Sequence, residues 1–187
     1  LSVFNSTISG NSSSGSGGGL YIPAGFTAVI ANSTISGNTS NGIHGDGGGG
    51  VYNGGSLTVS NSTITGNSSI GSGGGVRSSG NGKLILANSI VAGNTASTEP
   101  DIISYKAIDQ ISSNGANFIG DASGLSGFLP TDKSFASTGT TLSQLLAPLS
   151  DNGGPTLTHA LVSGSPAINA GANNGIPTDT HDLDGDA

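Results

Sequence analysis

The sequence predicts an all-β fold, a right-handed parallel β-helix in which each coil takes about 27–29 residues. The first observation behind this prediction is a seven-residue motif that occurs at residues 5–11, 32–38, 61–67 and 88–94. Its copies are NSTISGN, NSTISGN, NSTITGN and NSIVAGN, and their first asparagines are 27, 29 and 27 residues apart. The others are a glycine tract and a strand-like apolar run, which precede each of the three later copies. A repeat of this length predicts identical units that stack around one core.

Three short strands are expected in each coil, separated by turns. The first follows the glycine tract, in GSGGGLYI (15–22), GDGGGGVYN (45–53) and GSGGGVRS (71–78). The second is the apolar run, FTAVIA (26–31), SLTVS (56–60) or KLILA (83–87). The NSTISGN motif provides the third. Gly, Asn, Ser and β-branched residues dominate these segments and show no helical periodicity, so helical repeats are not expected.

Alternation along the strands predicts which side chains form the core. Leu57 and Val59 are expected inside, followed after the corner by Ile64, while Thr63 and Thr65 are expected outside. Because successive coils stack at about 4.8 Å, we expect two rows of core residues. One row is Val29, Val59 and Leu86, and the other is Ile8, Ile35, Ile64 and Val91.

The first asparagine of each motif is expected at a corner of the coil. A sharp corner needs a residue near the left-handed conformation, and asparagine tolerates it better than any residue except glycine. Stacked side-chain amides of these residues would form a hydrogen-bonded ladder; they are Asn5, Asn32, Asn61 and Asn88. The glycine tracts are expected to form a looser corner with close backbone contacts.

The motif also matches the N-x-S/T glycosylation signal at six positions, Asn5, Asn11, Asn32, Asn38, Asn61 and Asn67. The coil geometry already accounts for these residues, and a ladder asparagine would be inaccessible to a glycosyltransferase. We therefore expect a structural role for them.

The charge of the chain excludes one class of partner. It has 11 acidic and 4 basic residues and a formal net charge of −7. Nucleic acid is not an expected partner, because its binding needs a basic surface. The chain has no cysteine, and no apolar run approaches the length of a membrane span.

The regular repeat is expected to cover residues 1–102. Residues 103–187 are expected to continue the same solenoid irregularly, with longer loops and an acidic C-terminal tail. Leucines at i, i+3, i+4 and i+7 predict a short helix at 142–149. The strings TLTHAL and SPAINAG, at residues 156–161 and 165–171, are expected to form further rungs.

Several segments together resemble the choice-of-anchor Q type of bacterial β-helix surface protein. They are LILANSIVAGN (84–94), PDI (100–102), NFIGDASG (117–124) and APLSDNGGPTLTHALVSGSPAINAG (147–171). The upstream glycine and asparagine repeats are similar to those of polymorphic outer-membrane and autotransporter-like passengers. The resemblance implies a parallel β-helix that is exported to a bacterial surface or released. It implies no enzymatic activity.

The function expected from these patterns is structural and non-catalytic, that of an extracellular or cell-surface solenoid acting as an adhesin-like stalk or a filament subunit. Unpaired backbone groups at a terminal coil invite further strands, so self-association through the coil ends is expected. A surface glycan or another cell-surface partner fits an adhesin-like role.

A polysaccharide lyase or hydrolase on the same fold is one alternative. Such enzymes need clustered carboxylates, yet the stretch from residue 5 to 94 contains a single acid, Asp46. Four further aspartates would have to meet in space to make a pair; they are Asp101, Asp109, Asp121 and Asp132.

An ice-binding protein is a second alternative. Outward hydroxyl residues would form two rows on a flat face, made by Thr7 and Ser9, Thr34 and Ser36, and Thr63 and Thr65. Exposed strands favour such residues for other reasons too.

Calcium is the cofactor that the sequence suggests. Asp182, Asp184 and Asp186 occupy positions 1, 3 and 5 of an EF-hand-type loop and would supply hard oxygen ligands. Ala187 stands where the loop glycine belongs, so a solvated acidic tail is the alternative. His44, His159 and His181 have no metal-binding spacing.

Overall fold

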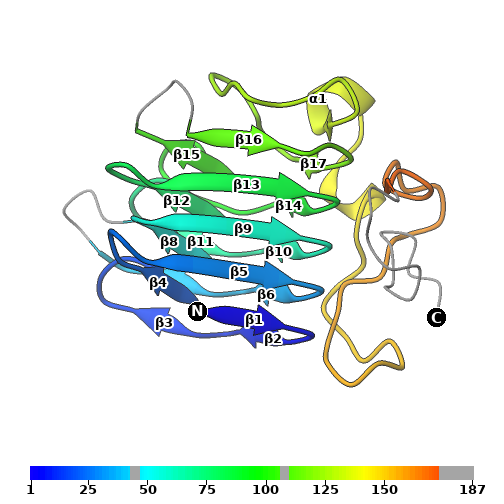
Figure 1. Ribbon diagram of the computed structural model, residues 1–187. Coiled ribbons are helices and arrows are strands. Elements are labelled where there is room, and N and C mark those ends of the chain that lie inside the picture. Colours follow the sequence, from blue (N-terminus) through cyan, green and yellow to red (C-terminus); the bar gives the residue numbers. More distant parts are fainter. Residues whose placement is uncertain (43–46, 106–109, 173–187) are drawn as a thin grey trace.

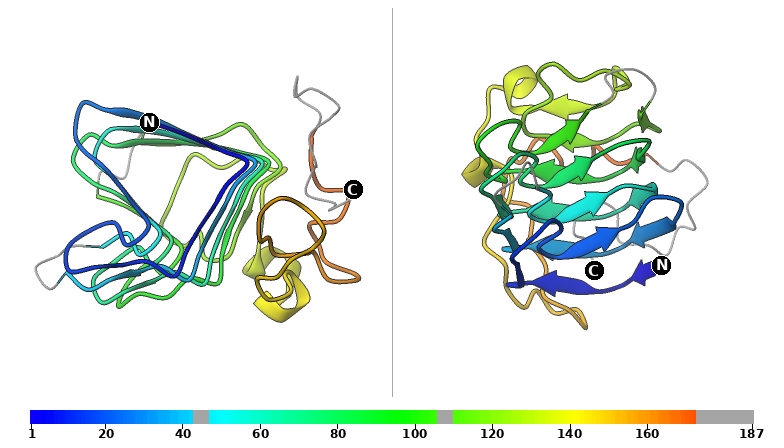
Figure 2. Two further views of the ribbon diagram at one scale, coloured as in Figure 1. Left: turned by 90° about the horizontal axis from the view of Figure 1, so that it is seen from below. Right: turned by 90° about the vertical axis from the view of Figure 1, so that its left-hand side faces the viewer.

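The chain winds into stacked coils whose strands form four parallel sheets (Figure 1). The computed structural model describes residues 1–42, 47–105 and 110–172. Seen along the stack, the coils superpose as a roughly triangular outline (Figure 2). The parallel β-helix predicted from the repeats is confirmed.

The first coils each contribute four strands, one more than the sequence predicted. Sheet A contains the apolar runs, β1 (Ser2–Phe4), β5 (Thr27–Ala31), β9 (Ser56–Ser60), β13 (Lys83–Ala87) and β16 (Ile111–Ser113). Sheet B contains the motif strands β2 (Thr7–Ser9), β6 (Thr34–Ser36), β10 (Thr63–Thr65) and β14 (Ile90–Ala92), then β17 (Phe118–Ile119) and β18 (Lys133–Ser134). Sheet C contains β3 (Ser12–Ser13), β7 (Thr39–Ser40) and β11 (Ser68–Ser69). Sheet D contains β4 (Leu20–Ile22), β8 (Val51–Asn53), β12 (Val76–Ser78) and β15 (Ile102–Ser104). The extra strands are those of sheet C, which pair only over two residues.

One predicted core row is confirmed and the other was wrong by one residue. Ile8, Ile35, Ile64 and Val91 are in register across sheet B. In sheet A, however, Val59 pairs with Ile30 and not with Val29, which lies beside Thr58 and points outward. Ile30 and Val59 each lie two residues before the corner asparagine of their own coil, Asn32 and Asn61. The position of this asparagine therefore sets the pairing register of sheet A.

The corner asparagines have the predicted backbone conformation. The φ angles of Asn5, Asn32, Asn61 and Asn88 are 47°, 50°, 46° and 47°. The glycine tracts lie at the opposite corner, where successive coils approach closely. A Cβ atom on Gly49 would collide with the backbone oxygens of Ser68 and Gly74, so only glycine fits there.

A polar loop closes the C-terminal end of the stack. Residues 121–132 follow β17, and Ala122, Leu125 and Phe128 pack partly buried against the main core. The chain then returns to sheet B as β18 and leaves the coils through α1 (Phe135–Thr138). The C-terminal end of the core is therefore capped, whereas β1 to β4 at the other end have a neighbouring coil on one side only.

Residues 139–172, called the strap below, run along the outside of sheet B instead of forming rungs. Figure 1 shows this yellow and orange segment descending beside the stack to the level of the first coil and returning. The strap contains one 3₁₀ turn, η1 (Leu142–Gln144), and antiparallel bridges from Leu146 to Leu161 and from Ser150 to Thr158. The predicted rungs at 156–161 and 165–171 were wrong, and the predicted helix at 142–149 is reduced to that single turn.

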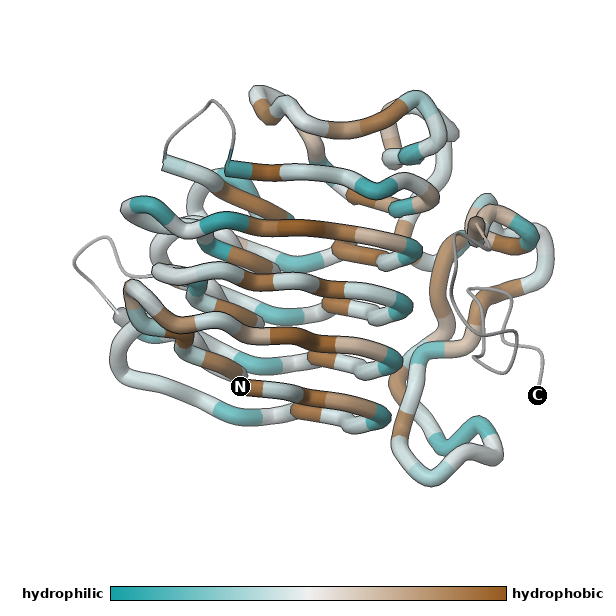
Figure 3. The backbone as a smooth tube through the Cα atoms, in the orientation of Figure 1, coloured by the Kyte–Doolittle hydropathy of each residue, from teal (hydrophilic) through white to brown (hydrophobic). Residues whose placement is uncertain are grey.

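A second apolar cluster attaches the strap to the coils. Leu145, Leu146 and Ala167 of the strap pack against Ile90, Ala92 and Phe118 of sheet B. In Figure 3 brown, apolar segments occur on both limbs of the strap, and one of these limbs runs directly beside the coils. Ala92 replaces the polar residue of earlier motifs at its position, which makes this part of the sheet apolar enough to bind the strap.

Candidate functional site

The asparagines that end the motif form a hydrogen-bonded ladder along the whole stack. The amide side chain of Asn38 donates to Asn67 Oδ1 at 2.9 Å, and that of Asn67 donates to Asn94 Oδ1 at 2.9 Å. Each oxygen also accepts the backbone N–H of the preceding asparagine, at 3.0 Å in both cases. The predicted ladder was therefore assigned to the wrong asparagines, because the side chains that point into the stack are Asn11, Asn38, Asn67 and Asn94.

This ladder also bears on glycosylation. Asn38 and Asn67 are completely buried, so their N-x-S/T signals are inaccessible in the folded chain. The corner residues Asn5 and Asn32 are exposed, contrary to the expectation that the corner amides form the buried ladder.

A parallel serine ladder runs beside the first corner. Ser33 Oγ accepts the N–H of Ser6 at 3.2 Å, and the pattern repeats through the following coils. Its members are Ser6, Ser33, Ser62, Ser89 and then Asn117. The hydroxyls in turn donate to the backbone oxygen two residues earlier, as Ser62 does to Ser60 at 2.7 Å.

Both ladders end on an aspartate at the capped end. Asp101 Oδ1 accepts from the backbone N and the Nδ2 of Asn94, each at 2.9 Å. Asp132 Oδ1 accepts from the same two atoms of Asn117, each at 2.9 Å. A carboxylate suits this position because it accepts hydrogen bonds without needing to donate one further.

Asp101 and Asp132, two of the four aspartates that a catalytic site would need, therefore have structural roles as ladder ends. The second oxygen of Asp101 accepts the N–H of Asp121 at 2.8 Å, so Asp101 is fully engaged. Asp121 Oδ1 accepts the N–H of Ser123 at 2.9 Å. Asp132 lies in the other ladder, and Asp109 lies outside the described residues.

Burial raises the pKa of Asp101 above its ordinary value, and the nearby charge of Asp121 adds to this, against the lowering effect of its hydrogen bonds. The folded chain therefore holds this proton more tightly than the unfolded chain does. We expect the free energy of unfolding to rise as the pH falls from about 7 through the raised pKa, and the gain to be complete below the unfolded pKa of about 3.9. Denaturant unfolding of the wild type and of Asp101→Asn over this range measures the effect. A constant difference between the two proteins across the range would contradict the prediction.

The hydroxyl rows that would define an ice-binding face are covered by the strap. Thr34, Ser36 and Thr65 are each at most 5% exposed. Ser36 Oγ lies 2.8 Å from Nε2 of His159, whose Nδ1 lies 2.8 Å from the backbone oxygen of Ala147. His159 is thus a hydrogen-bonded strap residue, and the rows do not form the exposed flat face that the sequence predicted.

A notch lies on the described surface, at the corner between sheets D and A. The turn between β4 and β5 has four residues (23–26), the turn between β8 and β9 has two (54–55), and the turn between β12 and β13 has four (79–82). The short middle turn leaves a gap between two longer ones, and in Figure 1 the turns before β5 and β13 reach further out than the turn before β9. The resulting cleft has a volume of about 620 Å³.

The rims of this notch are hydrogen-bonded turns. Phe26 N donates to Pro23 O at 3.2 Å, and Gly82 N donates to Ser79 O at 3.0 Å. Gly25 and Gly80 supply the positive φ angles, 82° and 63°, that such tight turns require. The shape of the notch is therefore built by the backbone.

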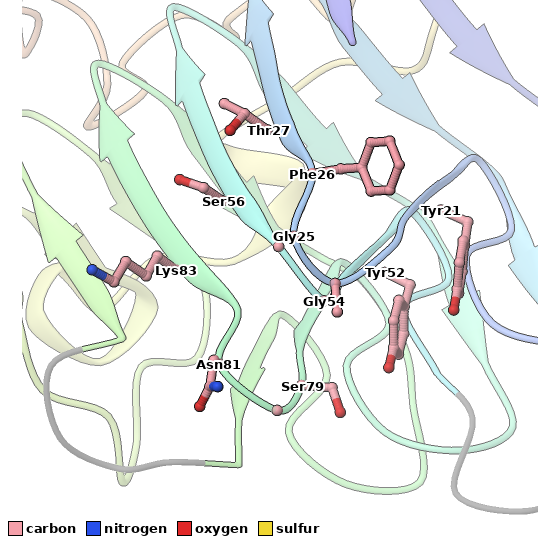
Figure 4. Close-up of a pocket in the computed structure, with 13 residues that line it drawn as sticks. Tyr21, Gly25, Phe26, Thr27, Tyr52, Gly54, Ser56, Ser79, Asn81 and Lys83 are labelled. Atoms are coloured by element: carbon pink, nitrogen blue, oxygen red, sulfur yellow. The ribbon is translucent and has the colours of Figure 1, made fainter.

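Aromatic and cationic side chains flank the notch (Figure 4). The rings of Tyr21 and Tyr52 are stacked with centroids 4.8 Å apart and an interplanar angle of 8°. Figure 4 shows this pair on one side of Gly54 and Lys83 on the other. The guanidinium of Arg77 lies 5.9 Å from the ring centroid of Tyr52 and 4.5 Å from that of Tyr105. The sequence analysis missed this site, although the turn lengths of the aligned repeats carried its signal.

The predicted calcium ligands Asp182, Asp184 and Asp186 lie outside the described residues, as do His44 and His181. Within the described part of the chain, no three His, Cys, Asp or Glu side chains gather in a way that could hold a metal ion. The described helices include none of the length and apolar character needed to cross a membrane.

No family model, curated protein or solved structure matches this chain. The geometry of the ladders, the strap and the notch is therefore the basis for inferring function.

Proposed function

We propose that this chain is a non-catalytic structural module of an extracellular or cell-surface β-solenoid, acting as an adhesin-like stalk. The observation that carries the proposal is the pair of polar ladders. They use the repeated polar residues of the motif for stacking, and they end on Asp101 and Asp132, two of the four aspartates that a catalytic site would need. A repeated, hydrogen-bonded stack is suited to hold a surface at a distance from its anchor.

The two ends of the stack support a stalk in preference to a head-to-tail filament. The C-terminal end is covered by residues 121–132, and its ladders end in groups that only accept. At the N-terminal end, the free Oδ1 of Asn11 is placed to accept from a preceding rung, and an aspartate cannot donate to it. In a preparation of this segment alone, we expect self-association to join the edges of β1 to β4 of two copies, which gives a closed pair.

The alternative of a polysaccharide lyase or hydrolase is tested directly. The purified chain is incubated with a panel of neutral and acidic polysaccharides, and reducing ends are measured over time. We expect no increase over buffer, because the carboxylates of Asp101 and Asp132 are held by ladder donors. Electron microscopy of the same sample should show short rods or end-joined pairs.

Two outcomes would contradict the proposal. Release of reducing ends that Asp121→Asn abolishes would favour the enzymatic alternative. Long unbranched filaments would favour the filament subunit over the stalk.

A further inference from the structure

We propose that the notch between the turns 23–26 and 79–82 binds an anionic oligosaccharide, a short sugar chain that carries carboxylate groups. The inference rests on the proposed adhesin-like function and names its class of ligand. The volume of about 620 Å³ falls in the range of about 300–1,000 Å³ that small-ligand sites occupy. Because the rims are closed by backbone hydrogen bonds, the cavity exists before a ligand arrives.

One side of the notch offers polar groups at a regular spacing. Thr27, Ser56 and Lys83 begin β5, β9 and β13 and pair with one another across sheet A. The residues that follow them, Ala28, Leu57 and Leu84, are fully buried, so these three side chains point outward. Two hydroxyls and an ammonium group spaced by one strand separation match the ring hydroxyls and the carboxylate of successive acidic sugars.

The other side offers aromatic surface. Tyr21 and Tyr52 are in register across sheet D, and Phe26 projects from the first rim. Tyr21 is 55% exposed and Phe26 63% exposed, so two of the large apolar side chains that the described surface exposes lie at this one cleft. The C–H faces of a sugar ring pack on such rings while its hydroxyls reach the polar side.

The charge of the notch selects an anionic ligand. The chain carries 11 acidic residues, yet none of the described residues that line the notch is Asp or Glu. Lys83 is exposed on one wall. Arg77 lies behind the other wall, buried, with its charge facing the rings of Tyr52 and Tyr105 and its Nη1 bonded to Ser72 Oγ at 3.0 Å. Among the described residues of this corner, the two cations have no carboxylate between them, which favours a positive potential here within an acidic protein.

A sugar chain fits this site better than a protein segment. The strands at the notch, β5, β9 and β13, are each paired on both sides, so none offers an edge to an added strand. The cleft is also polar along one wall, where a peptide-binding groove would bury apolar anchors.

The test is titration of the full chain with an array of uronic-acid oligosaccharides and their carboxyl-esterified counterparts. We expect at least one acidic member to bind, its esterified form to bind about tenfold more weakly, and affinity to fall with added salt. The bound oligosaccharide should be recovered uncut.

Three variants locate the site. Lys83→Gln should weaken binding about tenfold, and Tyr21→Ala should weaken it several-fold. Insertion of Asn-Gly between Gly54 and Gly55 should abolish binding, because it lengthens the middle turn to match its neighbours. Matched controls are Lys133→Gln, whose Nζ bonds the strap at Pro166 O, and Phe4→Ala, an exposed aromatic on β1. Circular dichroism establishes that each variant is folded.

Binding of no acidic member, equal binding of the esterified forms, or unchanged binding by folded Lys83→Gln and Tyr21→Ala would each overturn the inference. These outcomes are distinct from failure of the proposed function. A chain that binds no sugar but forms non-catalytic rods would still be a structural stalk.

Discussion

Replacing Asn67 with alanine is expected to lower the free energy of unfolding by about 3–5 kcal/mol. Its Nδ2 donates to Asn94 Oδ1 and to the backbone oxygen of Ile35, both at 2.9 Å. Its Oδ1 accepts two donors of Asn38. Alanine would leave the buried backbone N–H of Asn38 without an acceptor and would remove one of the partners of both Asn94 Oδ1 and Asn38 Nδ2. Denaturant unfolding measures the loss.

The matched control is the same substitution at a corner of the same motif, Asn32→Ala. Asn32 has a φ of 50° and is exposed, so alanine there adds only the cost of the left-handed conformation, about 1 kcal/mol. Equal losses at Asn32 and Asn67 would show that the inner ladder contributes no more than the corner does.

Replacing Leu145 with alanine is expected to cost about 2–5 kcal/mol, the range for a large buried aliphatic side chain. Leu145 is fully buried and belongs to the cluster that joins the strap to Ile90 and Phe118. Since the strap contributes no rungs, this cluster is its main apolar attachment. Thermal and denaturant unfolding of the variant measure the effect.

Leu157→Ala provides the comparison, because Leu157 lies on the same strap and is 43% exposed. A change within about 0.5 kcal/mol is expected there. If Leu145→Ala were equally mild, the strap would be a loosely attached segment and the hydroxyl rows of sheet B would be open to solvent.

The sequence predicted the coil and its corners because both depend on local rules. The left-handed conformation of Asn5, Asn32, Asn61 and Asn88 follows from residue type and period alone. The ladder was misassigned because the two asparagines of a motif are equivalent in spacing. Which of them points into the stack depends on how the strand turns at each corner, and a one-residue change in register inverts every side chain.

The strap was beyond sequence analysis for a different reason. Its leucines at 142, 145, 146 and 149 have helical spacing, yet only one 3₁₀ turn forms, at Leu142–Gln144. Contact with Ile90 and Phe118 of sheet B then holds the segment in place of a longer helix. In the sequence, Leu145 lies 55 residues from Ile90 and 27 residues from Phe118. Local helix propensity carries no information on such long-range contacts, and tertiary packing overrides that propensity here.

The notch could have been found from sequence. Once the repeats are aligned on the apolar runs, the turns before them contain four, two and four residues. An alignment centred on the motif does not reveal this difference, because all four copies of the motif have the same length. The repeats differ in the length of their turns, and binding sites are commonly built from such variable turns.

The one-way direction of the asparagine ladder sets an order for folding. Each coil offers donors to the coil that follows it, and the series ends on the carboxylate of Asp101. A coil that forms next to Asp101 finds an acceptor for its amide donors at once, whereas a coil that forms before its successor leaves those donors to water. The nucleus is therefore expected near the capped end, and coils add from there toward the N-terminus. In a chain that emerges N-terminus first, the early coils would stay unfolded until the segment around Asp101 is present to seed them.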